Sequence, residues 1–322
     1  MLNESPATPV PQRPLLGIFS LVSGLFLYSI QDMVIRAFAD DYSLLQIMWI
    51  RSAVSFLILL LAVLVVSGAD NLRGHKMGVM ITRGLMGSLA YIAYYLAIVI
   101  LPLAEAVAIV FTAPIFVTVF SALLFGERVG PRRWLAVLLG FCAVVIVLGP
   151  QGHFFKLASF LAFAAAITYA AMILLTGFVK DDNSTLVISF YASIGFVSGV
   201  AIASTVLLLL PPIESTNDTL LFLLREWRWP RTIDLLILVG LGFVATLGQF
   251  ALVKAYSVAP MSTVAPFEYS YVIWAVLFGY LFWDEVPGAW TWIGLSLLIA
   301  CNLYILYREQ QQLNVEKSCV RQ

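Results

Sequence analysis

Long apolar runs make up most of this sequence, and polar residues, glycine or proline separate each run from the next. A helix needs about 20 mostly apolar residues to cross the hydrocarbon core of a bilayer. Ten runs approach or reach that length: residues 15–37, 43–66, 78–99, 103–125, 131–149, 157–178, 185–210, 233–256, 261–282 and 289–307. None alternates apolar and polar residues with the period of two that membrane strands require. The sequence therefore predicts an all-α integral membrane protein with ten transmembrane helices.

The overall composition agrees with a membrane location. Hydrophobic residues make up 61% of the 322 residues and charged residues only 11%, whereas soluble domains carry roughly 25% charged residues. The 18 Lys and Arg balance the 18 Asp and Glu, so no positive excess favours nucleic acid as a partner. The three cysteines form no spaced framework for disulfides or a metal. We therefore expect no nucleic-acid partner, no metal and no cofactor.

Lysine and arginine are distributed unevenly between the loops. The tails and the loops after the second, fourth, sixth and eighth runs hold ten of them, and the opposite loops hold five. The positive-inside bias then predicts that both termini are cytoplasmic, in a cytoplasmic (inner) membrane, and that the insertion at residues 211–232 lies outside. Residues 220–229 of this insertion are expected to form a short amphipathic helix at the membrane interface.

The two ends of the chain are polar. Residues 1–14 contain four prolines and no basic region ahead of the first run, so we expect a disordered tail and not a cleaved signal peptide. Residues 308–322 are expected to form a cytoplasmic tail.

The two halves of the chain are similar when one is shifted by 158 positions. The identical pairs include Gly84 and Gly242, Pro102 and Pro260, Glu127 and Glu285, and Trp134 and Trp292. Because each half holds five runs, an odd number, the second half would enter the membrane from the opposite side. Such inverted repeats recur in secondary transporters. The alternative is a chance similarity between helices rich in leucine and alanine.

Two stretches resemble the signature of the EamA repeat in the drug/metabolite transporter superfamily. They are residues 103–129, LAEAVAIVFTAPIFVTVFSALLFGERV, and residues 259–287, APMSTVAPFEYSYVIWAVLFGYLFWDEVP. Arg51 and the Arg83-Gly84 pair are similar to family positions, and the second stretch is most like a subgroup that includes S-adenosylmethionine and riboflavin carriers. The resemblance covers most of the chain and implies two inverted five-helix EamA repeats, residues 15–149 and 157–307. It also implies a central cavity lined mainly by the first, third, fourth, sixth, eighth and ninth helices.

Ionisable side chains inside the runs are candidates for the site, because each costs at least about 2.5 kcal/mol to insert and usually faces a cavity or a partner. They are Asp32, Arg51 and Glu105 in the predicted outer half, and Arg83, Lys254 and Glu268 in the inner half. We expect two charge clusters that help to define alternating gates. Alternatively, Asp32 pairs with Arg36 four residues later, and Glu105 and Lys254 extend to the interface.

Aromatic and amide side chains at helical spacing form a second set of candidates. They are Tyr28, Gln31, Tyr91, Tyr94, Tyr95, Gln249, Tyr269 and Tyr271. Such faces can stack on a planar ring and donate hydrogen bonds to its edge, although aromatic residues also pack bundles or anchor them at the interface. Pro114 and Pro266 are expected to kink their helices, and Glu127 and Glu285 to act as structural caps.

Together these features predict a secondary transporter that moves a small polar or aromatic organic metabolite, similar to S-adenosylmethionine, a flavin or an amino acid, by alternating access. An exporter of amino acids, metallophores or toxic compounds from the same superfamily is one alternative, and an intramembrane enzyme is another. The sequence contains no phosphate loop and no His-Glu-x-x-His zinc motif. A small-molecule substrate and membrane lipid are the expected partners; the substrate, the direction, the coupling and the oligomeric state are left open.

Overall fold

The structure is a computed structural model. It describes residues 14–66, 74–113, 115–116, 119–120, 135, 138–139, 142–143, 145–146, 157–179, 182–209, 218–258, 267–268, 270–297, 299–300, 303–304 and 307.

The described part of the chain is helical and contains no strand. Its helices are α1 (Pro14–Ala37), α2 (Leu44–Val66), α3 (Met77–Ile98), α4 (Leu103–Val110), α7 (Leu157–Gly177), α8 (Thr185–Leu209), α9 (Asp218–Leu224), α10 (Thr232–Val258) and α12 (Ser270–Trp283). Residues 289–297 are also helical. Helices satisfy their own backbone hydrogen bonds, which is the condition for crossing a lipid interior.

Five of the described helices are long and apolar enough to cross a membrane: residues 15–37, 44–66, 157–177, 185–209 and 232–252. These agree with five of the predicted runs to within a few residues. Helix α3 has a similar length, but Arg83 and its three tyrosines make it more polar, and it packs between α7 and α8 inside the bundle. Helix α12 is shorter. The described residues therefore establish five spans, and the full number of ten stays a prediction.

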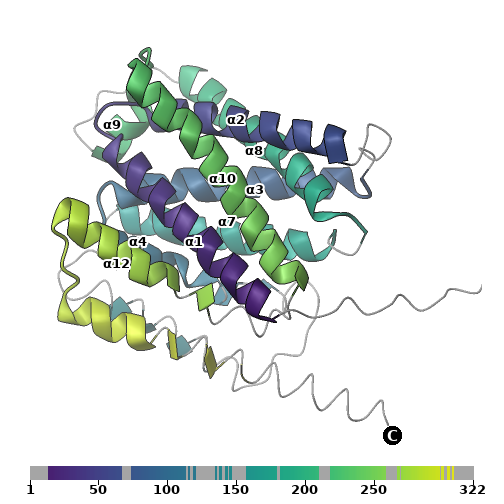
Figure 1. Cartoon of the computed structure of the whole chain (residues 1–322). Coiled ribbons are helices and arrows are strands. Elements are labelled where there is room, and N and C mark those ends of the chain that lie inside the picture. The colour runs from purple at the N-terminus through teal and green to yellow at the C-terminus, as the bar shows by residue number, and fades with distance from the viewer. Residues whose placement is uncertain are drawn as a thin grey trace, which may run out of the picture.

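The helices of the two halves pack in matching pairs (Figure 1). Helix α3 packs against α7 and α8, while α10 packs against α1 and α2. Helix α4 lies on α7 as α12 lies on α1, and α2 meets α8 as α4 meets α12. Exchanging α1 with α7, α2 with α8, α3 with α10 and α4 with α12 turns this set of pairs into itself. Two halves related by a two-fold axis produce this arrangement, in agreement with a two-repeat fold.

Equivalent glycines lie at close helix crossings in both halves. A Cβ atom on Gly84 of α3 would lie 2.0 Å from the backbone oxygen of Ala192 on α8. A Cβ atom on Gly242 of α10 would lie 2.5 Å from Cβ of Val54 on α2. These two glycines coincide in the 158-residue shift, so the residues that the sequence aligned occupy matching crossings. Small residues let helices approach closely where lipid gives no hydrophobic drive for association.

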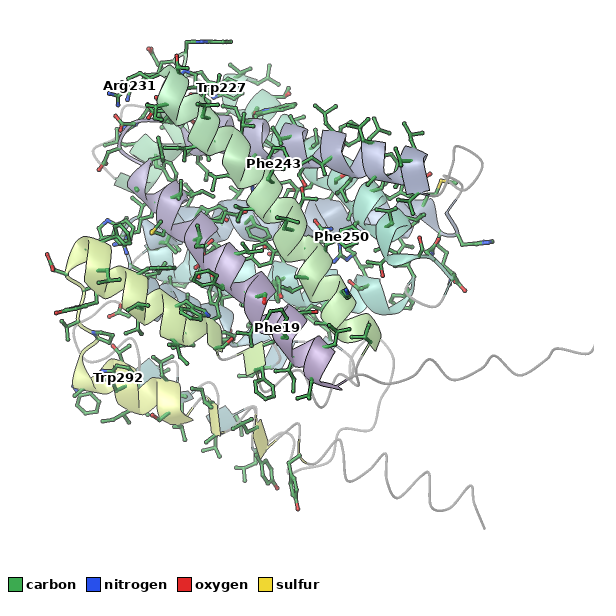
Figure 2. All side chains as sticks on the ribbon, viewed as in Figure 1. Phe19, Trp227, Arg231, Phe243, Phe250 and Trp292 are labelled. Carbon is green, nitrogen blue, oxygen red and sulfur yellow. The ribbon has the colours of Figure 1, made fainter. Side chains whose placement is uncertain are left out.

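The outer surface of the bundle carries large apolar side chains. Phe19 is 71% exposed, Phe243 53% and Val65 83%, and Figure 2 shows Phe243 and Phe250 along the outer side of α10. Exposed apolar surface on this scale marks a contact with lipid or another protein. We conclude that the long helices form a multi-pass membrane protein with lipid-facing sides.

The insertion after α8 is only partly helical. The expected helix at residues 220–229 is wrong in its extent, because α9 ends at Leu224 and residues 225–231 have no regular structure. Phe222 of α9 is buried in the main core, so this short helix docks on the bundle. Trp227 and Trp229 are exposed, as residues at a membrane interface would be.

Candidate functional site

A cavity of about 250 Å³ lies in the middle of the bundle. Its walls come from α1, α2, α3, α4, α7, α8, α10 and the start of α12. The helices that the family resemblance implied are all present, and α2 and α8 contribute in addition. A cavity between helices, mostly apolar with a few converging polar groups, is the usual form of a small-molecule site.

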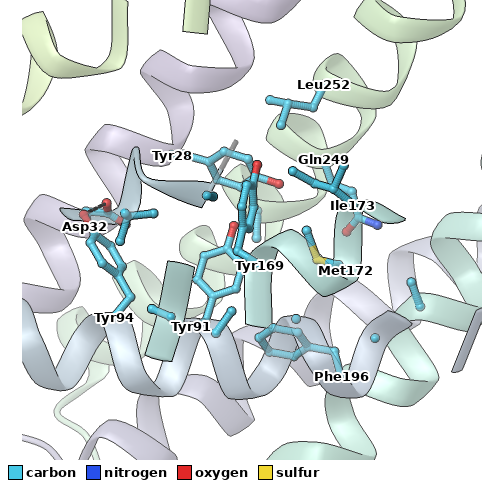
Figure 3. A pocket seen from close by; sticks show the side chains of 18 of the residues that line it. Tyr28, Asp32, Tyr91, Tyr94, Tyr169, Met172, Ile173, Phe196, Gln249 and Leu252 are labelled. Carbon is cyan, nitrogen blue, oxygen red and sulfur yellow. Dashed lines mark hydrogen bonds between the residues drawn. The ribbon is translucent and has the colours of Figure 1, made fainter. Parts of the chain in front are cut away.

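Most of the residues predicted from sequence line this cavity (Figure 3). They are Tyr28, Asp32, Arg51, Arg83, Tyr91, Tyr94, Gln249, Glu268 and Tyr271. Gln31 and Tyr95 are fully buried behind the wall. Lys254 is exposed and is not among the lining residues. Tyr269, Pro114 and Pro266 lie outside the described residues, and the binding roles of the whole set stay predictions.

Three tyrosine hydroxyls surround the carboxylate of Asp32, which is 2% exposed on α1. Tyr94 donates to Oδ2 at 2.8 Å, Tyr95 donates to Oδ1 at 3.2 Å, and Tyr271 donates to Oδ2. Among the described residues, no Lys or Arg forms an ion pair with Asp32. The carboxylate is therefore stabilised by hydroxyl groups from α3 and α12 rather than by a cation in contact.

The hydroxyl of Tyr95 joins this cluster to the guanidinium of Arg51. It accepts hydrogen bonds from Nε2 of Gln31 at 2.6 Å and from Nη1 of Arg51 at 3.4 Å. Arg51 is 4% exposed, and its Nε, like Oε1 of Gln31, is buried without a hydrogen-bond partner. Asp32 and Arg51, two members of the expected outer charge cluster, thus bond to the same hydroxyl but do not form an ion pair.

An aromatic wall extends from this polar cluster. The rings of Tyr28 and Tyr91 have centroids 6.4 Å apart, and Tyr91 meets Phe196 edge-on at 5.9 Å. Figure 3 shows Tyr169 of α7 grouped with Tyr28 and Tyr91. Sequence reasoning missed Tyr169 and Phe196, because no polar or charged partner at helical spacing distinguishes them from the other aromatic residues of α7 and α8. Only the pairing of α7 and α8 with α3 brings them to the cavity.

Arg83 and Glu268 of the second predicted cluster line the cavity. Nε of Arg83 donates to Oγ1 of Thr176 on α7 at 2.7 Å. Arg83, Gln249 and Glu268 are half-buried along the cavity wall.

Ordered side-chain contacts close one end of the bundle, where α1 and α12 end and α4 begins; we call this the capped end. Arg36 donates to both carboxylate oxygens of Glu285, at 2.5 and 3.0 Å, and its guanidinium lies 4.4 Å from the ring centroid of Trp283. Glu285 also accepts the backbone N–H of Leu103 at 3.0 Å. The predicted pairing of Asp32 with Arg36 is therefore wrong, because Arg36 finds a bidentate partner across the bundle.

The backbone at the end of α12 places Glu285 for this pair. Asp284 has a left-handed conformation with φ of 52°, which Asp tolerates better than most residues. The N–H groups of Asp284 and Glu285 donate to the carbonyls of Tyr280 and Gly279. The turn ends the helix and directs Glu285 back toward α1, so Glu285 acts as a structural residue, as the sequence favoured.

A second set of contacts holds the insertion to the same end. Tyr42 donates to Oδ2 of Asp234 at 2.5 Å, and Arg231 donates to the same carboxylate oxygen at 3.0 Å. Nε2 of Gln46 at the start of α2 donates to the carbonyl of Arg228 at 2.5 Å. These bonds link α2, α10 and residues 225–231 across the capped end.

On two helices the lining residues become less buried away from the capped end. On α1, Asp32 is buried while Tyr28 and Leu25 are half-buried; on α7, Ala165 is buried while Tyr169 and Met172 are half-buried. We call the other end, where α3 and α8 begin, the open end. Among the described residues, the mostly buried ion pair that joins the two halves, Arg36 with Glu285, lies at the capped end.

Lipid-facing helices around an internal cavity of aromatic and charged side chains define a helical membrane protein with a buried polar site. Among the described residues no group of His, Cys, Asp and Glu is arranged to hold a metal ion. A model of the EamA-like transporter family matches residues 15–149 and again residues 156–307. The chain therefore belongs to the EamA-like transporter family, within the drug/metabolite transporter superfamily.

Characterised relatives are transporters with different cargoes. The chain is 31% identical to a riboflavin transporter of Vibrio cholerae over 67% of each chain. It is 28% identical to the pseudopaline exporter CntI of Pseudomonas aeruginosa, over 88% of this chain and 94% of that protein. It is 23% identical to the S-adenosylmethionine uptake transporter of Rickettsia prowazekii, over 92% and 95%. One crystal structure covers 91% of this chain and 98% of its own, with a TM-score of 0.59 and 17% identity, which supports the fold alone.

Proposed function

We propose that this protein is a secondary transporter that carries a small polar or aromatic organic metabolite across the cytoplasmic membrane by alternating access. The observation that carries the proposal is the central cavity, which is lined by helices of both halves and lies beside an end that Arg36 and Glu285 link. A site between two similar halves can be opened to either side by rocking one half against the other.

The proposal includes ten spans in two inverted repeats, with both termini in the cytoplasm. The distribution of Lys and Arg then makes the capped end the outer one and the open end the cytoplasmic one. In this state the substrate would enter from the cytoplasm or leave toward it. The chemistry of the lining favours a ligand with a planar ring, because aromatic side chains stack with such rings, and with polar groups for the charged residues.

Two directions of transport are compatible with this arrangement. Relatives include uptake transporters and an exporter, so an exporter of amino acids, metallophores or toxic compounds is the first alternative. An intramembrane enzyme is the alternative of another class. The enzyme has less support, because the cavity is lined by hydroxyl and charged side chains and the described residues contain no cluster that could hold a metal ion.

A flux measurement with the purified protein tests the proposal. Untargeted mass spectrometry of cells and medium would first compare the wild type with Glu268→Gln, and with Glu226→Gln as a control for an exposed glutamate outside the cavity. Riboflavin, S-adenosylmethionine and any compound shifted by the wild type would then be tested in liposomes that contain only this protein. Saturable flux supports the carrier; product formation without flux would support the enzyme, and full transport by Glu268→Gln would remove that residue from the site.

A further inference from the structure

Arg51 has the largest unused hydrogen-bonding capacity at the cavity. Its side chain is 4% exposed and lines the cavity. Within the described part of the chain its one hydrogen bond is the long contact to Tyr95, at 3.4 Å, and Nε has no partner. A guanidinium presents a planar fork of N–H donors and stays protonated in proteins. A buried cation in this condition needs an acceptor that the described side chains do not supply.

Aromatic rings hold the guanidinium in place without satisfying its donors. Its central carbon lies 5.2 Å from the ring centroid of Tyr91, 5.2 Å from that of Phe196 and 5.8 Å from that of Tyr95. Such contacts attract the positive charge, but they leave the N–H edges available. The rings come from α3 and α8 while Arg51 comes from α2, so three helices fix its position.

Asp32 does not fill the role of a partner for Arg51. Its oxygens already accept bonds from Tyr94, Tyr95 and Tyr271, whereas the guanidinium has one weak bond. Oε1 of Gln31 is also buried without a donor, but it is a neutral amide oxygen, so the guanidinium of Arg51 still lacks an anionic acceptor among the described residues. By contrast, Arg36 at the capped end has a bidentate carboxylate partner, and Arg83 is half-buried and bonds to Thr176.

We propose that Arg51 binds an anionic oxygen group of the substrate, so that the transported metabolite carries a carboxylate or a phosphate next to its ring. Arginine pairs with both groups through two parallel N–H···O bonds. The anion of the substrate accepts hydrogen bonds from the guanidinium of Arg51, and the ring of the substrate lies against Tyr28, Tyr91 and Tyr169. This inference rests on the proposed transport function and names the class of its substrate.

Binding to purified protein in lipid nanodiscs tests this inference with two matched pairs of probes. Riboflavin and its phosphate ester, flavin mononucleotide, share a ring and differ by a phosphate. Tryptamine and tryptophan share a ring and differ by a carboxylate. We expect the member with the anionic group to bind about tenfold more tightly or better in at least one pair. A preference in the first pair alone identifies a phosphate, and one in the second pair alone identifies a carboxylate.

Variants separate a direct contact from a structural role. In Arg51→Gln the ratio of the two Kd values in the preferred pair should fall to near one, and Arg51→Lys, which keeps the charge but loses the fork, should give an intermediate ratio. Arg225→Gln, which removes a positive charge outside the cavity, should leave the ratio unchanged. A purely structural role would weaken both members of a pair equally and leave the ratio as it is.

Three results would overturn the inference: no anion preference in the wild type, no binding of any of the four probes, or an unchanged ratio in Arg51→Gln and Arg51→Lys. Failure of the transport proposal alone would give a different result. The protein would bind anionic probes selectively, but liposomes that contain it would show no flux.

Discussion

The two ends of the helix bundle are built from different contacts. At the capped end, buried or half-buried pairs such as Arg36–Glu285 and Tyr42–Asp234 link helices from both halves. At the open end, the ion pair of Lys76 with Asp182 joins two loops and is about half exposed. Among the described residues, mostly buried pairs between the halves therefore lie at the capped end, and the pair at the open end is exposed. In the proposed alternating access, the capped end must break these specific bonds each time it opens.

The largest effect is expected from crowding the crossing of α3 and α8 near the open end. In Gly84→Ala the new Cβ meets backbone atoms of Ala192 and Phe196, which cannot move aside as a flexible side chain could. We expect a loss of about 3 kcal/mol, visible as a lower melting temperature in detergent. Gly240→Ala is the matched control, because no atom lies within 4 Å of its Cβ position. Equal stability of the two variants would contradict the close approach of α3 and α8 at Gly84.

Breaking the ion pair at the capped end should have the next largest effect. Glu285→Gln leaves Arg36 without its counter-ion, although Arg36 is only 10% exposed, and we expect a loss of about 2 kcal/mol. We also expect a cysteine placed at Asp32 to react faster with a thiol reagent that approaches from the capped end. Glu226→Gln, an exposed position at the same end, should change neither quantity. An unaltered labelling rate would show that this pair does not close the cavity.

Removing one hydroxyl from the capped end should have a smaller effect. Tyr42→Phe deletes the bond to Asp234 and the long bond from the backbone N–H of Arg231, but it leaves the ring and the bond between Arg231 and Asp234, so we expect a loss of about 1 kcal/mol. Thermal melting would measure it against Tyr280→Phe, whose side chain is exposed. If the two variants melted at the same temperature, Tyr42 would not be one of the contacts that stabilise the capped end.

The smallest effect is expected at the open end. The hydrogen bond from Lys76 lowers the pKa of the Asp182 carboxyl below its ordinary value. A lowered pKa means that this contact stabilises the fold at neutral pH, and that the stabilisation is lost as the pH falls below about 4. Asp182→Asn should therefore change stability slightly at pH 7 and weaken the pH dependence in that acidic range. A large change in melting temperature at pH 7 would mean that the open end is held more firmly than its exposure suggests.

Local sequence patterns were sufficient to predict the five long apolar helices of the described residues. The period and length of the apolar runs place α1, α2, α7, α8 and α10 within a few residues, because a span of fixed thickness needs a run of fixed length. The shift that aligned Gly84 with Gly242 also anticipated two matching crossings. The membrane class and the family followed from these features.

The detail of the site depended on contacts between distant helices. Sequence spacing suggested an ion pair between Arg36 and Asp32, whereas in the structure Arg36 pairs with Glu285, which lies 249 residues away. In the same way Tyr169 and Phe196 reach the cavity only because α7 and α8 pack on α3. A single helix pattern contains no information on such pairings, so sequence reasoning selected many lining residues but not their partners.

The most direct test of alternating access is to lock the capped end. Cysteines would replace Arg36 and Glu285 in a protein whose native cysteines are replaced by serine, and a reducible bis-methanethiosulfonate reagent would link them. Flux of the identified substrate would be measured in liposomes before linking, after linking and after reduction. The account predicts that linking abolishes flux and that reduction restores it, because the capped end must open in each cycle. Undiminished flux through the linked protein would contradict it.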